Sequence, residues 1–311
     1  LEHLRGLGFD ALLARRACDE RAYMAGTVEA RVADLHDLLL QPEVRAIVAT
    51  TGGLSTNQLL DDIDYRLFRR HPKIIMGYSD ITALLLAVHK RTTLVTFLGP
   101  AILPQFGEPH GLHPYVAGSL RRVLMSTRTP VDLPPSRCVI HEQLAWERDE
   151  VRPRCEEAHG GPRVVHAGRA RGRIVAGNLS TLLALAGTRF FPDLRGAILC
   201  VEDDDSESPA SVDRMLTQLR LMGAYREIAA LILGRFPRAS GLDEPTLGEV
   251  LSSAMRGEAV PTAIEFDFGH TDPMFILPIG VEAEVNLGAR ARLRLLESGV
   301  AQRAGTAPAR G

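Results

Sequence analysis

The chain has 311 residues, of which 45% are hydrophobic and 24% charged, and its formal net charge is -2. This length favours two domains over one, and this composition supports packed cores and argues against disorder. The near-neutral charge gives no indication of a nucleic-acid partner or of binding to a membrane surface. Because no apolar run reaches the length of a membrane span and no signal peptide opens the chain, we expect a cytoplasmic protein.

Alternating strands and helices in the first part of the chain predict a parallel α/β sheet. In order, the predicted elements are helices over 1–17 and 27–40, a strand over 44–49, a helix over 57–68, a strand over 73–76, a helix over 81–88 and a strand over 93–98. Ligands on such sheets bind at the carboxyl ends of the strands. Gly52-Gly53, Ser79 and Gly99-Pro100 all follow predicted strands, so we expect the site among them.

The composition changes over residues 129–172, where prolines and charged residues predict a linker or irregular loop. The single tryptophan, Trp146, falls inside it, and packing is a more common role for such a residue than a ligand platform. Further elements follow. They are strands over 173–176, 197–201, 228–233 and 262–266, helices over 181–186, 210–222 and 247–255, and several short strands between 275 and 296.

Ser79 follows the apolar strand Lys73–Met76 and the turn residue Gly77, and an apolar helix begins just after it. A serine on a strand-to-helix turn exposes its hydroxyl, and the helix N-terminus offers N–H groups to a developing oxyanion. We expect Asp80 to cap that helix. Ile81 replaces the second glycine of a G-x-S-x-G motif, so the alternative of a serine capping an ordinary helix stays open.

Two further positions at strand ends complete a possible catalytic group. Glu202 ends the apolar strand 197–201, and His270 follows the strand 262–266. Together with Ser79 they have the composition of a nucleophile, a base and a group that orients the base. Gly52-Gly53 allows close approach of a ligand or an oxyanion contact, but it is equally compatible with a bare turn.

Cofactor motifs are absent from the sequence. It contains no Walker A loop and no G-x-G-x-x-G, which argues against nucleotide-triphosphate and dinucleotide cofactors. The acidic run 202–205 lacks the alternating ligands of a calcium loop, so a solvated loop is the simpler interpretation. No C-x-x-C spacing occurs among the cysteines, so we expect reduced thiols and no metal. The cysteines are Cys18, Cys138, Cys155 and Cys200.

Several of these stretches, taken together, resemble the LD-carboxypeptidase family of serine peptidases, in matching order and over nearly the whole chain. The resemblance is carried by Thr50–Gly53, Ile63–Tyr65, Pro72-Lys73, Gly77–Leu84, Gly99–Ala101, Gly177–Thr181, Gly187-Thr188, Val201–Asp203 and Phe268–His270. The segment from Thr96 to Glu108 is more similar to the microcin C7 immunity (MccF-like) branch than to the murein-recycling branch.

The resemblance implies a Ser-His-Glu triad of Ser79, His270 and Glu202, and an oxyanion hole from the N–H groups of Asp80 and of Gly52 or Gly53. It also implies substrate contacts at Asn178 and, if the linker aligns, stacking on Trp146. The implied fold is a flavodoxin-like N-terminal domain and a smaller β-rich α/β C-terminal domain, usually in a homodimer. We expect these domains at 1–135 and 173–311, joined by a linker at 136–172.

The implied substrates differ between the branches. The murein branch cleaves the L,D bond before a terminal D-alanine, and the MccF branch cleaves an amide that joins an acyl group to a nucleotide-like moiety. A ligand-binding homologue with impaired catalysis is the alternative to an enzyme. A protein like the glutamine amidotransferases is ranked last, because Ser79 stands where that class needs cysteine. Family members also begin with a strand before the first helix, so we expect one sheet strand to be missing.

Overall fold

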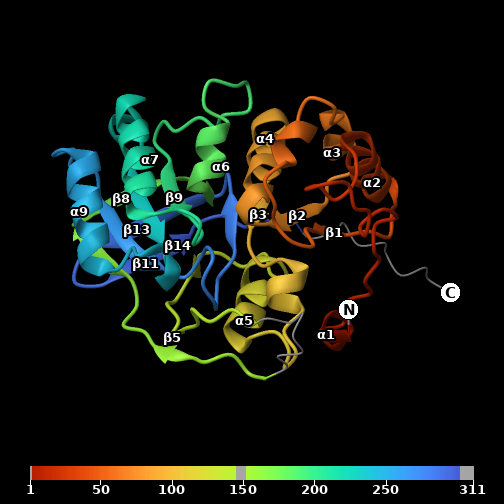
Figure 1. The fold of residues 1–311 in the computed structure, drawn as a ribbon, viewed down its shortest axis with the longest axis horizontal. Coiled ribbons are helices and arrows are strands. Elements are labelled where there is room, and N and C mark those ends of the chain that lie inside the picture. Colours follow the sequence, from red (N-terminus) through yellow and green to blue (C-terminus); the bar gives the residue numbers. More distant parts are fainter. Residues whose placement is uncertain (1, 145–151, 302–311) are drawn as a thin grey trace.

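Two β-sheets with helices packed on them form the frame of the protein (Figure 1). The structure is a computed structural model, and it describes residues 2–144 and 152–301. The first sheet has the strand order β1-β2-β3-β12, and the second has the order β4-β14-β13-β8-β9-β10-β11-β7. The predicted α/β fold, with a parallel sheet and a second, β-rich part, is confirmed.

The first sheet combines three parallel strands with one strand from much later in the chain. Strands β1 (Ala46–Val48), β2 (Ile74–Gly77) and β3 (Thr96–Leu98) are parallel, and β12 (Leu277–Ile279) pairs antiparallel with β3. β3 and β12 are buried throughout, as is typical of strands covered on both faces. Helices on this part of the molecule are α1 (Glu2–Gly6), α2 (Val28–Leu40), α3 (Tyr65–Arg70) and α4 (Thr82–Thr92) (Figure 1).

The long strand β8 (Gly168–Asn178) joins the two halves of the second sheet. Its first part alternates between partly buried and exposed residues where it pairs antiparallel with β13 (Glu282–Leu287). Its last five residues are all buried where it runs parallel to β9 (Ile198–Glu202). This change follows the rule that antiparallel strands can face water on one side, whereas parallel strands are covered on both.

The remaining elements complete the second sheet and its helices. β9, β10 (Ala230–Gly234) and β11 (Thr262–Phe266) are parallel, and α7 and α9 lie side by side against this part of the molecule (Figure 1). The other bounds are β14 (Ala291–Leu295), α5 (Pro114–Val123), α6 (Leu179–Ala184), α7 (Pro209–Leu221), α8 (Ala224–Glu227) and α9 (Glu244–Met255). The short helical turns are η1 (Thr56–Leu59), η2 (Ser79–Ile81), η3 (Ile102–Phe106) and η5 (Arg238–Ser240).

The segment predicted as an irregular linker contains short strands, so that prediction is wrong in part. β4 (Val131–Asp132) extends the second sheet beside β14, β5 (Cys138–Val139) pairs with β6 (Glu157–Ala158), and β7 (Arg163–His166) pairs with β11. Edge pairing gives these short pieces backbone partners that the sequence pattern does not reveal. The division of the chain at 135 and 172 stays a prediction.

Two predicted helices are wrong in extent. The helix over 1–17 ends at Gly6, and Gly8 adopts a positive φ of 85° that a helix does not tolerate. The helix over 57–68 is divided into η1 and α3, because the side chain of Asp64 accepts a hydrogen bond from the Arg66 N–H and caps α3 there. No helix within 2–144 and 152–301 is long and apolar enough to cross a membrane.

We predict that Gly172→Ala destabilises the fold, because an added Cβ on β8 would overlap the carbonyl oxygen of Gly196. The backbone of Gly196 cannot rotate away as a side chain would, so we expect a loss of about 1–3 kcal/mol. Chemical denaturation measures it. The matched control is Gly248→Ala in α9, where the new Cβ would have no atom within 4 Å other than its chain neighbours and the backbone of its own helix. Equal stability of the two variants would contradict this packing account.

Candidate active site

Ser79 lies in a strained turn at the carboxyl end of β2. Its φ is 61°, in the left-handed region that residues with a Cβ rarely adopt. The turn η2 begins at Ser79 and leads directly into α4, whose first residue is Thr82. This strand–turn–helix context is the one in which a strained serine serves as a nucleophile.

The glycine pair after β1 lies against this turn. A Cβ on Gly52 would come within 2.8 Å of both Cβ and Oγ of Ser79, and 3.7 Å from the backbone nitrogen of Asp80. A Cβ on Gly53 would meet only Asp80 Oδ2, at an ordinary 3.5 Å. Gly52 is therefore the position where the missing side chain leaves room beside the serine hydroxyl.

The prediction that Asp80 caps the following helix is wrong. The carboxylate is buried, and its Oδ2 accepts hydrogen bonds from the backbone N–H groups of Ser55 and Thr56 and from the Thr56 hydroxyl, at 2.7–2.9 Å. Helix α4 has no side-chain cap. Asp80 therefore fixes the loop after Gly52-Gly53 against the serine turn. Its partner Ser55 lies 25 residues away in the sequence.

Glu202 and His270 form a hydrogen-bonded pair. Glu202 is fully buried at the end of β9, and its Oε2 lies 2.7 Å from Nδ1 of His270. Because a carboxylate accepts hydrogen bonds, Nδ1 carries the proton and Nε2 is left for another partner. A Cβ on Gly234 would come within 2.9 Å of the Glu202 Cβ, and one on Gly269 within 2.8 Å, so these glycines make the space for the carboxylate.

Electrostatics favour the protonated form of this imidazole. Burial lowers the pKa of His270, but the charge of Glu202 and its hydrogen bond raise it more, and the resulting pKa is about 9. An imidazolium formed by proton transfer would therefore be stabilised here.

Polar and aromatic contacts connect the serine turn to the histidine loop. The ring of Tyr78, the residue before Ser79, packs on the ring of His270 with a centroid distance of 4.9 Å. Thr82 Oγ1 accepts a hydrogen bond from the backbone N–H of Asn178, at 2.9 Å, and Asn178 lies beside Glu202 in the parallel pairing of β8 with β9. Sequence reasoning missed Tyr78 and Thr82 as site residues, although both lie in the stretch around Ser79.

The histidine loop is held at both ends by buried carboxylates. Asp267 forms an ion pair with the buried Arg235 at 3.2 Å and accepts hydrogen bonds from the Tyr115 hydroxyl and the Ser136 N–H. At the other end, Asp272 exchanges backbone hydrogen bonds with Ile140. Both aspartates lie close to His270 in the sequence, and this proximity could have marked them as site residues. Their partners could not be predicted in the same way, because they lie far away along the chain.

Within the acidic run 202–205, the side chains of Glu202 and Asp203 bind different partners. Asp203 is buried, and it accepts hydrogen bonds from the Asn178 side chain and the Ser180 N–H at the start of α6. Burial and then the charge of Glu202 raise the pKa of Asp203 to about 6, although these hydrogen bonds oppose the shift. Asn178 also caps α6 by accepting from the Thr181 N–H, so its predicted contact with substrate stays a prediction.

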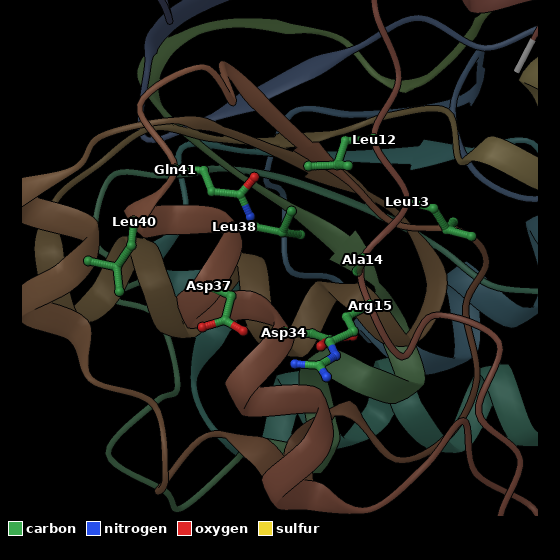
Figure 2. A pocket seen from close by; sticks show the side chains of 9 residues that line it. All are labelled: Leu12, Leu13, Ala14, Arg15, Asp34, Asp37, Leu38, Leu40 and Gln41. Carbon is green, nitrogen blue, oxygen red and sulfur yellow. The ribbon is translucent and has the colours of Figure 1, made fainter.

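Trp146 lies outside the described residues. Two hollows in the described part of the chain are lined by residues other than Glu202 and His270. One, of about 370 Å³, lies between the N-terminal segment and α2 and is lined by residues such as Leu13 and Leu38 (Figure 2). A second lies between Asn57 and Phe190. We place the candidate site on the strand ends because the interacting ionisable groups lie there.

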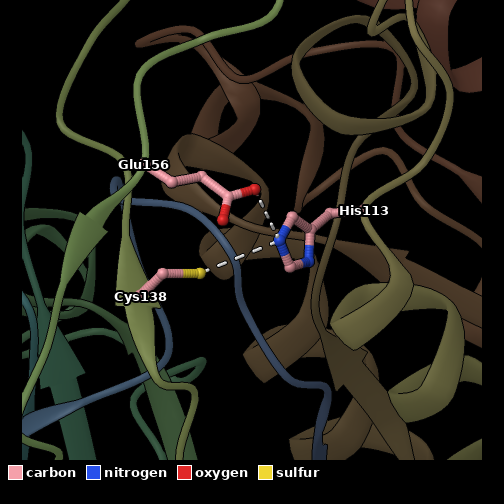
Figure 3. A group of neighbouring side chains, drawn as sticks. All are labelled: His113, Cys138 and Glu156. Carbon is pink, nitrogen blue, oxygen red and sulfur yellow. Dashed lines mark hydrogen bonds and ion pairs between the residues drawn. The ribbon is translucent and has the colours of Figure 1, made fainter.

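A second cluster of ionisable side chains comprises His113, Cys138 and Glu156 (Figure 3). The Nε2 atom of His113 lies 3.4 Å from Glu156 Oε1 and 3.9 Å from Cys138 Sγ. However, Nδ1 of His113 accepts the hydrogen bond of the Tyr115 N–H at the start of α5, so a neutral ring carries its proton on Nε2. That tautomer has no lone pair for a metal at Nε2, and we assign no metal to the cluster.

Two family models match the chain. They are the LD-carboxypeptidase N-terminal domain, over residues 1–99, and the LD-carboxypeptidase C-terminal domain, over residues 171–285. Together they account for more than half of the sequence.

Similar proteins cover nearly the whole chain. A putative carboxypeptidase of Treponema pallidum is 33% identical over 97% of this chain and 87% of its own length, and a probable murein peptide carboxypeptidase of Bacillus subtilis is 32% identical over 96% and 86%. The microcin C7 self-immunity protein MccF of Escherichia coli is 31% identical over 92% and 84%. A structure of MccF in complex with glutamyl sulfamoyl guanosine aligns with a TM-score of 0.87 and 29% identity over 96% and 90%.

We predict that Gly52→Ala lowers kcat/KM by about 100-fold, because the added methyl group would displace the serine hydroxyl from its position. Steady-state hydrolysis assays measure this, with thermal denaturation as a check on folding. Gly53→Ala is the matched control and should change kcat/KM by less than about threefold, since its Cβ makes an ordinary contact. Two equally active variants would show that activity does not depend on the space beside the Ser79 hydroxyl.

Proposed function

Because the chain belongs to the LD-carboxypeptidase family, in its MccF-like branch, we propose that it is a serine peptidase or amidase with Ser79, His270 and Glu202 as its triad. The hydrogen bond between buried Glu202 and His270 is the observation that carries this proposal. The left-handed φ of Ser79 and the packing of Tyr78 on His270 support it.

In the proposed reaction, Ser79 Oγ attacks the amide carbonyl carbon and its proton passes to Nε2 of His270. Glu202 stabilises the imidazolium, and the backbone N–H groups of Asp80 and of Gly52 or Gly53 stabilise the oxyanion. The imidazolium then protonates the leaving amine, and the C–N bond breaks to give an acyl-enzyme. Water, deprotonated by the same imidazole, hydrolyses the ester and releases the acid.

For the substrate, we propose an aminoacyl group joined through an amide to a nucleotide-like moiety. The similarity of the segment from Thr96 to Glu108 to the MccF-like branch supports this class, as does the alignment with MccF bound to glutamyl sulfamoyl guanosine. The murein peptide carboxypeptidase relative makes an L,D-tetrapeptide the second candidate. A cytoplasmic homodimer is part of the same proposal.

A hydrolysis panel followed by mass spectrometry tests the substrate. It compares aspartyl sulfamoyl adenosine with a disaccharide tetrapeptide that ends in D-alanine. We expect cleavage of the first compound with kcat/KM at least about tenfold above that for the second, because a pocket shaped for the nucleoside loses its polar contacts with a sugar-peptide. The reverse ratio would assign the protein to murein peptides.

The nucleophile is tested by Ser79→Ala, which should lower kcat by about four to six orders of magnitude with unchanged thermal stability. A fluorophosphonate probe should label the unmodified protein and not this variant. Ser253→Ala, on the exposed surface of α9, is the matched control and should leave both readouts unchanged. Absence of labelling and turnover in the unmodified protein would favour a ligand-binding homologue without catalysis.

The pH dependence follows from the Glu202–His270 pair. A general base must be neutral, so kcat/KM should rise with pH as His270 loses its proton near pH 9. Glu202→Gln removes the charge that raises the pKa, so the rise should move to lower pH while the plateau falls by about 10⁴-fold. The ion pair also contributes to the free energy of unfolding. This contribution is fully present below pH 6.5 and is lost as pH rises through 9. An unshifted profile in Glu202→Gln would remove Glu202 from this role.

A further inference from the structure

We propose that Arg154 is a positioning residue that holds the loop of His270 against the serine turn, an inference that rests on the function proposed above. Arg154 belongs to the segment between the predicted domains. Its Nε lies 2.6 Å from Oε1 of Glu108, and its Nη2 lies 2.7 Å from Oδ2 of Asp272. One guanidinium therefore joins the segment after β3 to the loop that carries the histidine.

The side chains of this ion-pair group are largely shielded from water, unlike those of most arginine pairs among the described residues. The side chains of Arg154 and Glu108 are each 12% exposed and that of Asp272 is 8% exposed. The nearby pair of Arg152 and Glu142 has exposures of 54% and 29%. Since exposed pairs contribute little and shielded ones respond more strongly to the loss of one partner, we expect the charge of Arg154 to matter more than that of Arg152.

A continuous set of contacts leads from Arg154 to the imidazole. Asp272 lies two residues after His270, and its Oδ1 accepts a hydrogen bond from the side-chain amide of Gln105 at 3.3 Å. The same Gln105 nitrogen donates to the Tyr78 hydroxyl at 3.3 Å, and the Tyr78 ring packs on His270. Gln105 is in turn fixed by the Ala101 N–H, which donates to its Oε1. Asp272 is thus linked to the imidazole both along the chain and through Gln105 and Tyr78.

Without the guanidinium, the carboxylates of Glu108 and Asp272 would face each other without the cation that now joins them. Burial raises the pKa of Glu108, the charge of Arg154 lowers it and the charge of Asp272 raises it, so the two carboxylates act on each other. Their repulsion would move Asp272, and with it the histidine loop and Gln105. A shift of about 1 Å in a catalytic group is sufficient to cost about 100-fold in rate.

The experiment compares kcat, KM and the rate of fluorophosphonate labelling at Ser79 in four variants of the full chain. Arg154→Met should lower kcat and the labelling rate by about 100-fold with KM within about threefold. Arg238→Met, the same change at an exposed pair with Glu157 (side chains 67% and 41% exposed), should leave all three unchanged. Glu108→Gln added to Arg154→Met should restore about tenfold of the loss, because it removes one uncompensated charge. Arg154→Lys should lose about tenfold, since an ammonium cannot bridge both carboxylates as a fork.

The double variant distinguishes a positioning role of Arg154 from a general loss of order in the segment that carries it. Rescue by Glu108→Gln supports the proposal, because added loosening would not speed labelling. Equal kcat in the Arg154→Met and Arg238→Met variants, or a double variant no faster than Arg154→Met, would overturn it. If Arg154→Met does not fold, an Arg154→Lys variant with unreduced kcat overturns it instead. An unmodified protein that neither labels nor turns over substrate refutes the proposed function and this inference with it.

Discussion

The buried carboxylate of Glu202 is the constraint on which the rest of the candidate site depends. A fully buried carboxylate without a partner would be strongly unfavourable, and here it contacts Nδ1 of His270 at 2.7 Å. The space for it exists because Gly234 and Gly269 lack side chains. The pair fixes the tautomer of the imidazole and leaves Nε2 for chemistry. Glu202 ends β9, which is buried along its whole length, so the carboxylate has little freedom to move.

The histidine that completes this pair is carried by a loop that belongs to neither sheet alone. The loop begins after β11 of the second sheet and is followed by β12, which pairs with β3 of the first. Asp267 and Asp272 fix its two ends through Arg235 and Arg154, on opposite sides of His270. A change in the relative position of the two sheets would therefore move this loop, and the ion pairs of Asp267 and Asp272 oppose such a change.

The serine side and the histidine side of the site are held in place by different kinds of interaction. The serine side is held mainly by backbone: the strained turn at Ser79, the close approach of Gly52 and the N–H groups that bind Asp80. The histidine side is held mainly by side-chain charge in a buried environment. In the proposed mechanism, the N–H groups of Asp80 and of Gly52 or Gly53, which are not the ones that bind the Asp80 carboxylate, would face the developing oxyanion. The buried carboxylate of Glu202 would face the developing imidazolium.

The sequence by itself determined the α/β class, the positions of most strands, and the polar residues that follow them. Hydrophobic runs and turn residues encode these features locally, which is why the Ser79 turn and the strand ending at Glu202 could be predicted. Tertiary structure decided which partner each polar group takes. It directs Asp80 to Ser55 and Thr56 instead of α4. It also places Arg154 between Glu108 and Asp272. Such partners lie 24 to 118 residues apart, and periodicity carries no information about contacts at that separation.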